Sequence, residues 1–371
     1  MRVVMACGGT GGHIYPAIAI ADKIRRRRPD CEILFIGARR GMERDIVPAR
    51  GYELRCIDVR GFDRRRLHRN AGALVALLRA CGEARRILRG FAPDLVIGTG
   101  GYASGPVLRE AGRAGIAAYI HEQNAFPGMA NRLAERYAEK VFVAFAESGR
   151  HFKSKEKLVV TGNPVRREFA ARGLVDHRER LGVAPREFAL LVFGGSLGAR
   201  ALNEALFAIL RELFAEEDLR LFFVSGARHY DEARAAFAAR GIPSEGRFRV
   251  MAYTDEMHAY MCAADLVISR AGALAVSEIT ACGRASVLIP SPNVTGNHQF
   301  FNAKSAADRG AALLLEEAEL SPARLLDAVL RLKSDKALLN RMSAASESLG
   351  RLDAADVIYE HIAAGLRERG E

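Results

Sequence analysis

The chain has 371 residues, of which 49% are apolar, and its formal net charge is +11 at pH 7. This length is too great for one ordinary hydrophobic core and this composition is too apolar for a disordered protein, so two folded domains are expected. No run approaches the roughly 18 uncharged apolar residues of a membrane-spanning helix, and the first apolar run is too short for a signal peptide. The cysteines are scattered and form no C-x-x-C pair, which argues against a zinc site or a disulfide framework.

Short apolar runs alternate with helical patterns along the chain, which predicts parallel β-sheets covered by helices on both faces. The first series of expected strands comprises residues 3–6, 33–36, 54–57, 95–97, 117–120, 141–143 and 158–160. The second series comprises residues 189–193, 221–224, 248–251, 266–268, 286–289 and 312–315. The expected fold class is therefore α/β, with two Rossmann-like halves that each contain a parallel sheet.

The two halves are expected to join near the stretch TGNPVR, residues 161–166, where Pro164 favours an extended chain. We therefore expect an N-terminal domain over residues 1–163 and a C-terminal domain over residues 164–349. Residues 350–371 have a helical pattern and could pack back on either domain, with the N-terminal domain as the candidate.

Each half opens with a strand, a glycine turn and an amphipathic helix, in VVMACGGTGGHIYPAIAIADKI and in ALLVFGGSLGARALNEALFAIL, and a third turn has the sequence GTGGYASG. Such turns expose backbone N–H groups at the positive end of a helix, where they bind anions, although a tight turn without a ligand is the alternative. The first turn lacks the G-x-G-x-x-G spacing, and the second strand ends in FIGARR without an acidic residue to hold a ribose. A hydride-transfer enzyme is therefore disfavoured but not excluded.

Polar residues gather where other strands end. The stretch YIHEQNAFPG places His121, Glu122, Gln123 and Asn124 in one loop. The stretch SRAGALAVSEITACG carries Glu278 on a helix, and PSPNVTGNHQFFNA follows the next strand. Because ligands of open α/β sheets bind at the carboxyl ends of the strands, the polar residues of these loops are candidates for a binding site.

Six stretches, GGTGGHIYPA, HEQNAFPG, TGNPVR, GGSLGAR, SRAGALAVSE and NHQFFNA, resemble in order the motifs of the MurG family of bacterial peptidoglycan glycosyltransferases. The resemblance covers nearly the whole chain and implies a GT-B fold, in which two Rossmann-like domains face a cleft. It implies inverting transfer of N-acetylglucosamine (GlcNAc) from UDP-GlcNAc, without a metal or other cofactor. The implied acceptor is the C4 hydroxyl of the N-acetylmuramic acid (MurNAc) sugar of lipid I, undecaprenyl-pyrophosphoryl-MurNAc-pentapeptide, and the implied products are lipid II and UDP.

The resemblance further implies a peripheral protein on the cytoplasmic face of the bacterial inner membrane, with a role in cell-wall synthesis, cell shape and cell division. The expected partners are UDP-GlcNAc, lipid I and an anionic membrane surface, and nucleic acid is not expected to bind. Binding to other cell-wall synthesis and division proteins is left open. Another lipid-directed GT-B enzyme, such as a diacylglycerol glycosyltransferase, is the nearest alternative. A nucleotide-cofactor oxidoreductase and a noncatalytic basic binding module are alternatives from other classes.

The transfer needs a base for the acceptor hydroxyl and groups that stabilise the departing diphosphate. His13 is the first candidate base because imidazole titrates near physiological pH, and Glu122 is the second. By resemblance, Arg166 and Ser196 contact the diphosphate, and Glu278 accepts hydrogen bonds from both ribose hydroxyls. The resemblance assigns further UDP-GlcNAc contacts to Thr10, Gly11, Gly12, Asn124, Tyr253, Ala273, Leu274, Ala275, Val276, Ser277 and Gln299. Each of these residues could instead serve only the local fold.

The segment from Arg60 to Arg89 holds nine arginines against Asp63 and Glu83, a net charge of +7. Leucines recur there at helical spacing, which fits either a core helix with a solvated basic face or a surface that docks on an anionic membrane. Because lipid I is embedded in the membrane, we favour docking, and the expected docking residues are Arg64, Arg65, Arg66, Leu67, Leu74, Leu77 and Leu78. Nucleic acid is disfavoured because no aromatic-rich platform or reader motif is present.

Overall fold

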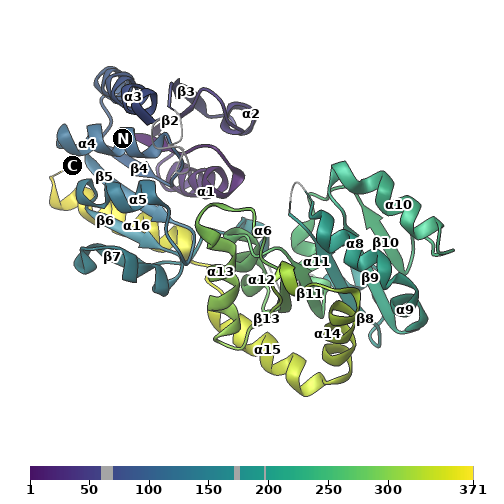
Figure 1. Ribbon diagram of the computed structural model, residues 1–371. Coiled ribbons are helices and arrows are strands. Elements are labelled where there is room, and N and C mark those ends of the chain that lie inside the picture. Colours follow the sequence, from purple (N-terminus) through teal and green to yellow (C-terminus); the bar gives the residue numbers. More distant parts are fainter. Residues whose placement is uncertain (60–69, 171–175, 196–197, 371) are drawn as a thin grey trace. The chain divides into compact units, whose positions relative to one another are not determined.

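The computed structural model describes residues 1–59, 70–170, 176–195 and 198–370. The chain divides into two compact units: unit 1 comprises Met1–Pro164 with Asp353–Glu371, and unit 2 comprises Val165–Leu352. Each unit contains one parallel sheet with helices packed on it (Figure 1). The predicted α/β class with two parallel sheets is therefore confirmed.

Unit 1 has a seven-stranded sheet in the order β3-β2-β1-β4-β5-β6-β7, and its neighbouring strands are parallel. The strands are β1 (Arg2–Ala6), β2 (Glu32–Ala38), β3 (Glu53–Ile57), β4 (Leu95–Gly98), β5 (Ala117–Glu122), β6 (Lys140–Val143) and β7 (Leu158–Val160). Each strand expected in the first series is present. The direction of winding reverses between β1 and β4, which makes this pair the topological switch point of the sheet.

Helices cover both faces of the unit 1 sheet. They are α1 (Gly11–Arg27), α2 (Glu43–Ala49), α3 (Asn70–Phe91), α4 (Ser104–Arg113), α5 (Met129–Ala134) and α16 (Ala354–Glu368). Successive residues of β1 point to opposite faces, so that Val3 joins an apolar cluster with α1 and α16, whereas Val4 joins a cluster with α3 and α4.

The last helix returns to unit 1 and packs against α1. Ile358 and Ile362 of α16 are buried in the same apolar cluster as Ile14 of α1. At the surface, Arg27 pairs with Glu360 at 2.5 Å between Nη2 and Oε1. The apolar contacts stabilise this packing more than the exposed ion pair does, since exposed pairs contribute about 0–1 kcal/mol.

Unit 2 has a six-stranded parallel sheet in the order β10-β9-β8-β11-β12-β13. The strands are β8 (Phe188–Phe193), β9 (Leu219–Val224), β10 (Phe248–Met251), β11 (Leu266–Ser269), β12 (Ala285–Leu288) and β13 (Ala312–Leu314), and each strand expected in the second series is present. The helices are α6 (Arg167–Ala170), α7 (His177–Arg180), α8 (Arg200–Ala208), α9 (Leu210–Ala215), α10 (Tyr230–Ala238), α11 (Met257–Ala263), α12 (Ala273–Ala281), α13 (His298–Ala307), α14 (Pro322–Ser334) and α15 (Lys336–Leu349). The switch point of this sheet lies between β8 and β11.

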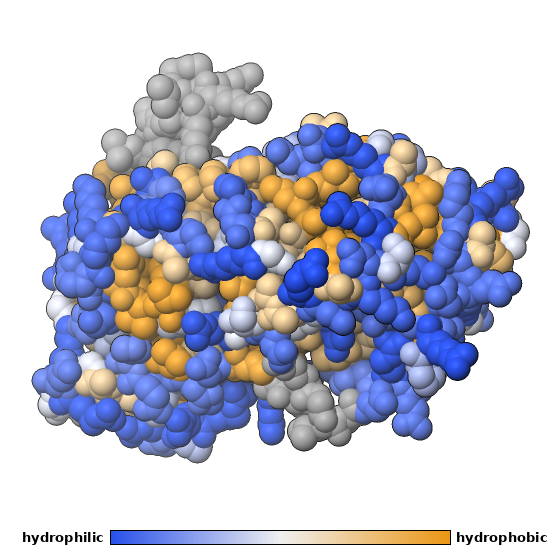
Figure 2. Space-filling model, turned by 90° about the horizontal axis from the view of Figure 1, so that it is seen from below, coloured by the Kyte–Doolittle hydropathy of each residue, from blue (hydrophilic) through white to orange (hydrophobic). Residues whose placement is uncertain are grey.

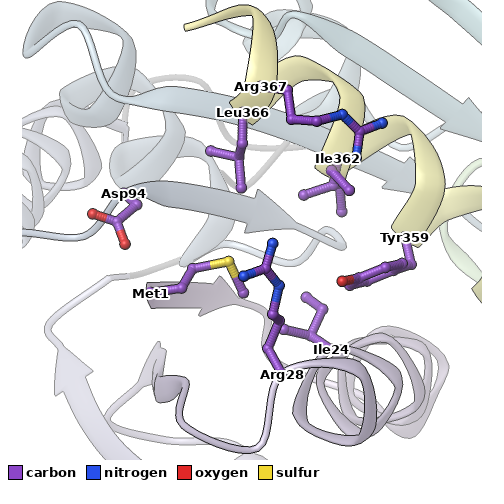
Figure 3. Close-up of a pocket in the computed structure, with 9 residues that line it drawn as sticks. Met1, Ile24, Arg28, Asp94, Tyr359, Ile362, Leu366 and Arg367 are labelled. Carbon is purple, nitrogen blue, oxygen red and sulfur yellow. The ribbon is translucent and has the colours of Figure 1, made fainter. Parts of the chain in front are cut away.

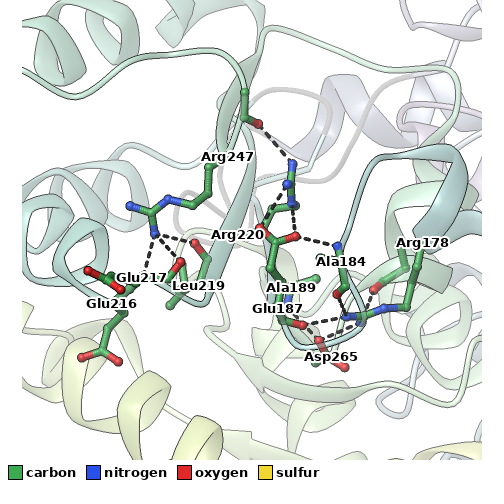
Figure 4. A network of polar contacts seen from close by, with 12 residues as sticks. Arg178, Ala184, Glu187, Ala189, Glu216, Glu217, Leu219, Arg220, Arg247 and Asp265 are labelled. Carbon is green, nitrogen blue, oxygen red and sulfur yellow. Dashed lines mark hydrogen bonds and ion pairs between the residues drawn. The ribbon is translucent and has the colours of Figure 1, made fainter.

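Charged residues join the amino ends of the strands in unit 2 (Figure 4). Asp265, directly before β11, accepts hydrogen bonds from Arg178 Nη1 at 2.9 Å and from the backbone N–H of Ala189 at 2.8 Å. Glu187, directly before β8, holds the Arg220 guanidinium through two contacts of 2.8 and 3.0 Å. These contacts fix the amino ends of β8, β9 and β11 relative to one another.

The pKa of Glu187 lies below its ordinary value. Burial raises it, but the hydrogen bonds from the Arg220 side chain and the Ala184 backbone N–H outweigh the burial and lower it. A carboxylate whose pKa is lower in the folded than in the unfolded chain stabilises the fold above the unfolded-state pKa, and this stabilisation is lost as the pH falls through the folded-state pKa.

No helix in the described part of the chain is both long and apolar enough to cross a membrane. On the face drawn in Figure 2, hydrophobic side chains form separate patches among hydrophilic ones.

We expect Arg220→Met to lower stability at pH 7 by about 2 kcal/mol, because it removes two charged hydrogen bonds from a pair whose side chains are each only 15% exposed. The loss should shrink as the pH falls through the folded-state pKa of Glu187, which lies below its ordinary value. Urea unfolding midpoints at pH 7 and at successively lower pH measure this loss. Lys304→Met, in an exposed pair with Asp308, is the matched control and should change little. Equal losses for both variants, or a loss independent of pH, would contradict this account.

Candidate functional site

Unit 1 gathers its candidate side chains at the carboxyl edge of its sheet. The loop after β1 leads to His13 in the first turn of α1, the loop after β4 begins at Thr99, and β5 ends at Glu122. Because β4 lies between β1 and β5 in the sheet, the three strand ends are neighbours at the switch point. The residues that the sequence places in separate motifs therefore share one edge.

The first glycine turn is packed tightly against its neighbours. Thr10 is the extended N-cap residue of α1, and Gly11 and Gly12 begin the helix without an acidic residue in the first turn. A Cβ on Gly101, whose φ is +83°, would lie 2.2 Å from the carbonyl oxygen of Gly8, so the close contact of the loops after β1 and β4 requires glycine at position 101.

Glu43, which our sequence reasoning missed, stabilises the same turn through its side chain. Its buried carboxylate accepts hydrogen bonds from the backbone N–H groups of Gly9 at 3.0 Å and Ala38 at 2.8 Å. No sequence signal marks it, because a glutamate in the first turn of a short helix is ordinary.

His13 is half-buried and is held through one ring nitrogen. Its Nδ1 lies 3.0 Å from the carbonyl oxygen of Thr99 and 3.0 Å from Oε1 of Gln123. The Thr99 hydroxyl in turn donates a hydrogen bond of 2.8 Å to the carbonyl oxygen of His13. These contacts connect the ends of β1, β4 and β5 through a single imidazole.

Glu122, the second candidate base, is 1% exposed and already accepts four hydrogen bonds. Oε1 accepts from the backbone N–H and the side-chain amide of Asn124 at 3.0 and 3.2 Å, and Oε2 accepts from the Gly128 N–H at 3.0 Å and the Asn131 amide at 2.9 Å. A carboxylate with this many partners shapes the loop after β5, and Asn124 is one of the residues it positions.

In unit 2 the candidate residues lie at the carboxyl edge around α12. Gly272 caps this helix with an extended backbone, and its first turn contains no acidic residue. Ala273 and Val276 are buried, whereas Leu274, Ala275 and Ser277 are half-buried. Tyr253, which follows β10, is 63% exposed.

The structure brings Arg166 and Glu278 together, although 112 positions separate them in the sequence. Arg166 Nε donates to Glu278 Oε1 at 3.3 Å, and the guanidinium also lies 5.2 Å from the ring centroid of Phe169. The side chain of Arg166 is 40% exposed and that of Glu278 is 17% exposed. Burial raises the pKa of Glu278, and the charge and hydrogen bond of Arg166 oppose that increase.

The loop after β12 is tied to the start of α13. Gln299 accepts a hydrogen bond of 2.9 Å on Oε1 from the backbone N–H of Ser291. Asn302, a second residue that our sequence reasoning missed, is buried and donates a hydrogen bond of 3.1 Å to the carbonyl oxygen of Ala271, just before α12. Asn302 therefore fixes the residues just before α12, and Gln299 fixes the loop after β12.

Several predicted residues belong to the nucleotide site or to the docking segment. Ser196, Arg64, Arg65, Arg66 and Leu67 lie outside the described residues. Leu74 belongs to α3, but its side chain is not described, whereas Leu77 is half-buried and Leu78 is 61% exposed. Their assigned roles stay predictions.

Within the described ranges, no group of three or more His, Cys, Asp or Glu residues is arranged to hold a metal ion. A cavity of about 270 Å³ in unit 1 is lined by residues near the amino ends of β1 and β4 (Figure 3), whereas His13 follows the carboxyl end of β1. Its lining includes Met1 before β1, Asp94 before β4, and Ile24, Arg28 and Tyr359 from α1 and α16. This cavity is therefore separate from the candidate site.

Comparison with known proteins agrees with this arrangement of two sheets. Residues 3–143 match the Glycosyltransferase family 28 N-terminal domain, and residues 189–358 match the Glycosyltransferase family 28 C-terminal domain. The crystal structure of MurG from Acinetobacter baumannii is similar with a TM-score of 0.80 and 30% identity, over 98% of this chain and 99% of that chain.

Curated relatives match over the full length. Two proteins named UDP-N-acetylglucosamine–N-acetylmuramyl-(pentapeptide) pyrophosphoryl-undecaprenol N-acetylglucosamine transferase are similar to this chain. The one from Desulforudis audaxviator is 42% identical over 98% of both chains, and the one from Alkaliphilus oremlandii is 41% identical over 100% of both. On these matches, the chain belongs to glycosyltransferase family 28, in the group of the MurG enzymes.

Proposed function

We propose that the chain transfers GlcNAc from UDP-GlcNAc to the C4 hydroxyl of the MurNAc sugar of lipid I, with inversion, and releases lipid II and UDP. The observation that carries this proposal is the 42% identity, over 98% of both chains, to a relative that is named for this transfer. The matches to two glycosyltransferase domains disfavour a nucleotide-cofactor oxidoreductase and a noncatalytic binding module.

His13 is the proposed base. The acceptor oxygen forms a bond to C1 of GlcNAc while the bond between C1 and the diphosphate oxygen breaks, and UDP leaves with the electron pair. Because Nδ1 of His13 faces two oxygens, the hydroxyl proton passes to Nε2 and then to water. Such proton transfer contributes about 10²–10⁴-fold to the rate. The four hydrogen bonds of Glu122 support a structural role for that residue.

Unit 2 is the proposed donor site, with Glu278 on the ribose hydroxyls and Arg166 on the diphosphate. Since these two side chains pair with each other, nucleotide binding exchanges one ion pair for a guanidinium–phosphate and a carboxylate–hydroxyl contact. The exchange costs little, because the pair is long and Arg166 is 40% exposed. In this proposal Arg166 and Glu278 each hold the other until the nucleotide binds.

The other assigned residues complete the proposed contacts. Residues 273–277 present the start of α12 to the nucleotide, Ser196 adds a hydroxyl to the diphosphate, and Tyr253 contacts the uracil. Asn124, Gln299 and the turn of Thr10, Gly11 and Gly12 contact the sugars. The hydrogen bonds of Asn124 and Gln299 to neighbouring loops support their having fixed positions.

We also propose that α3 docks on an anionic membrane. Val75 is 49% exposed and Leu78 is 61% exposed on this helix, and the arginines that follow them on α3 are exposed. Exposed apolar side chains beside basic ones suit an interface in which the former enter the headgroup region and the latter meet its charge. Reaching a membrane-embedded lipid acceptor requires a surface of this kind.

The transfer itself is tested by mixing the protein with labelled UDP-GlcNAc and either a lipid I analogue or diacylglycerol in vesicles. We expect label on the lipid I analogue only, at a rate that His13→Gln lowers by roughly 100-fold or more. Thin-layer chromatography of the lipid products measures it. Transfer to diacylglycerol alone, or no transfer to either lipid, would overturn the proposal.

For the docking surface, Leu78→Glu should weaken binding to phosphatidylglycerol-containing vesicles by about 10-fold, because an apolar contact is replaced by a like-charged group. Vesicle sedimentation at low salt measures the partition. Val160→Glu is the matched control, since Val160 is 50% exposed on β7 of the same unit and outside α3. Equal binding by wild type and Leu78→Glu would remove α3 from the membrane contact.

A further inference from the structure

A buried chain of hydrogen bonds runs from His13 to the end of unit 1. Beyond its contact with His13, Gln123 places Nε2 2.9 Å from Nδ1 of His121 and 2.9 Å from the carbonyl oxygen of His121. Nε2 of His121 lies 3.2 Å from the carbonyl oxygen of Gly162. His121 is 0% exposed and Gln123 is 1% exposed, so these contacts form without competition from solvent.

This series of hydrogen bonds ends at residues 161–163, just before the polypeptide enters unit 2. Gly162 supplies the carbonyl oxygen that faces His121. Its neighbour Asn163 donates a hydrogen bond of 3.0 Å to the carbonyl oxygen of Gln123. The Thr161 hydroxyl donates to the carbonyl oxygen of Gly162 at 3.0 Å. Gln123 and His121 are therefore fixed by the segment TGNP as well as by their own strand.

Only one arrangement of protons satisfies these contacts. A backbone carbonyl is only an acceptor, so Gly162 requires a hydrogen on Nε2 of His121. Burial lowers the pKa of His121 to about 4, so the ring is neutral at pH 7 and its Nδ1 carries the lone pair. This lone pair and the His121 carbonyl both need a donor, which must be the NH₂ group of Gln123.

The orientation of Gln123 then decides the state of His13. With NH₂ toward His121, Oε1 is the atom that faces Nδ1 of His13, and the Thr99 carbonyl faces the same nitrogen. Two acceptors require a hydrogen on Nδ1, which leaves the lone pair on Nε2. The opposite orientation of the amide would set Oε1 against the carbonyl oxygen of His121, and that contact is repulsive.

We propose that Gln123 and His121 are positioning residues that fix His13 in its Nδ1–H tautomer, so that Nε2 is the nitrogen that takes the proton. This inference rests on the function proposed above. The two oxygens on Nδ1 also stabilise the imidazolium that forms when Nε2 is protonated. Gly100 leaves room for the arrangement, because a Cβ there would lie 2.8 Å from Nδ1 of His13.

The tautomer is measured directly by NMR on wild-type protein with ¹⁵N-labelled histidine rings. Long-range ¹H–¹⁵N correlations identify which nitrogen carries the hydrogen, and the His13 signals are those absent from His13→Gln. We expect the Nδ1–H form for His13 and the Nε2–H form for His121. An Nε2–H form for His13 would overturn the proposal, whether or not any variant folds.

Kinetics test the positioning role. Gln123→Met keeps the length of the side chain but removes its acceptor and donors, so kcat should fall about 10- to 100-fold while KM for UDP-GlcNAc stays within about twofold. Part of the His13 signal should also move to the Nε2–H form. Ser148→Ala is the matched control, because it removes a buried hydrogen bond of 2.7 Å to Phe145 elsewhere in unit 1, and it should keep a near-normal kcat.

The outcomes separate the two proposals. Normal kcat in Gln123→Met, or an unchanged tautomer of His13 in that variant, would overturn the positioning role while the transfer by wild type stands. Equal losses of kcat in Gln123→Met and Ser148→Ala would also overturn it, since the effect would then be general. If wild type transfers no GlcNAc, the proposed function fails, and the tautomer measurement still decides what Gln123 does to His13.

Discussion

The parallel direction of every strand is the constraint on which the rest of this structure depends. It puts the carboxyl ends of all strands of a sheet at one edge, where short loops can hold polar side chains without breaking the core. His13 and Glu122 share that edge in unit 1, and α12 begins there in unit 2. The amino edge of the unit 2 sheet serves the fold through ion pairs such as Arg220–Glu187, and α16 packs with α1 on one face of the unit 1 sheet.

Buried polar groups near the strand ends act as rigid supports. Glu43, Glu122 and Gln123 are almost fully buried, and each satisfies neighbouring backbone N–H groups or side chains rather than solvent. A buried polar group that lost its partner would cost about 1–3 kcal/mol, so such networks tolerate few alternative geometries. A proton acceptor held in this way keeps one orientation, which general base catalysis requires.

Much of the fold could be predicted from the sequence because parallel strands and covering helices leave strong apolar patterns. Each expected strand, from 3–6 to 312–315, overlaps a strand of the structure. The pairing of Arg166 with Glu278 could not be predicted, because no local pattern records a contact across 112 positions. The same holds for the partners of Glu122 and for the supporting role of Glu43, which depend on side-chain geometry. The roles of Ser196 and of residues 64–67 stay predictions from resemblance alone.

The central claim is that the carboxyl edge of unit 2, at the start of α12, binds the donor nucleotide. A crystal structure of the protein with UDP-GlcNAc tests it most directly. The account predicts the ribose hydroxyls on the Glu278 carboxylate, the diphosphate beside Arg166, and a broken contact between these two side chains. A nucleotide bound elsewhere, with Arg166 and Glu278 still paired, would contradict it.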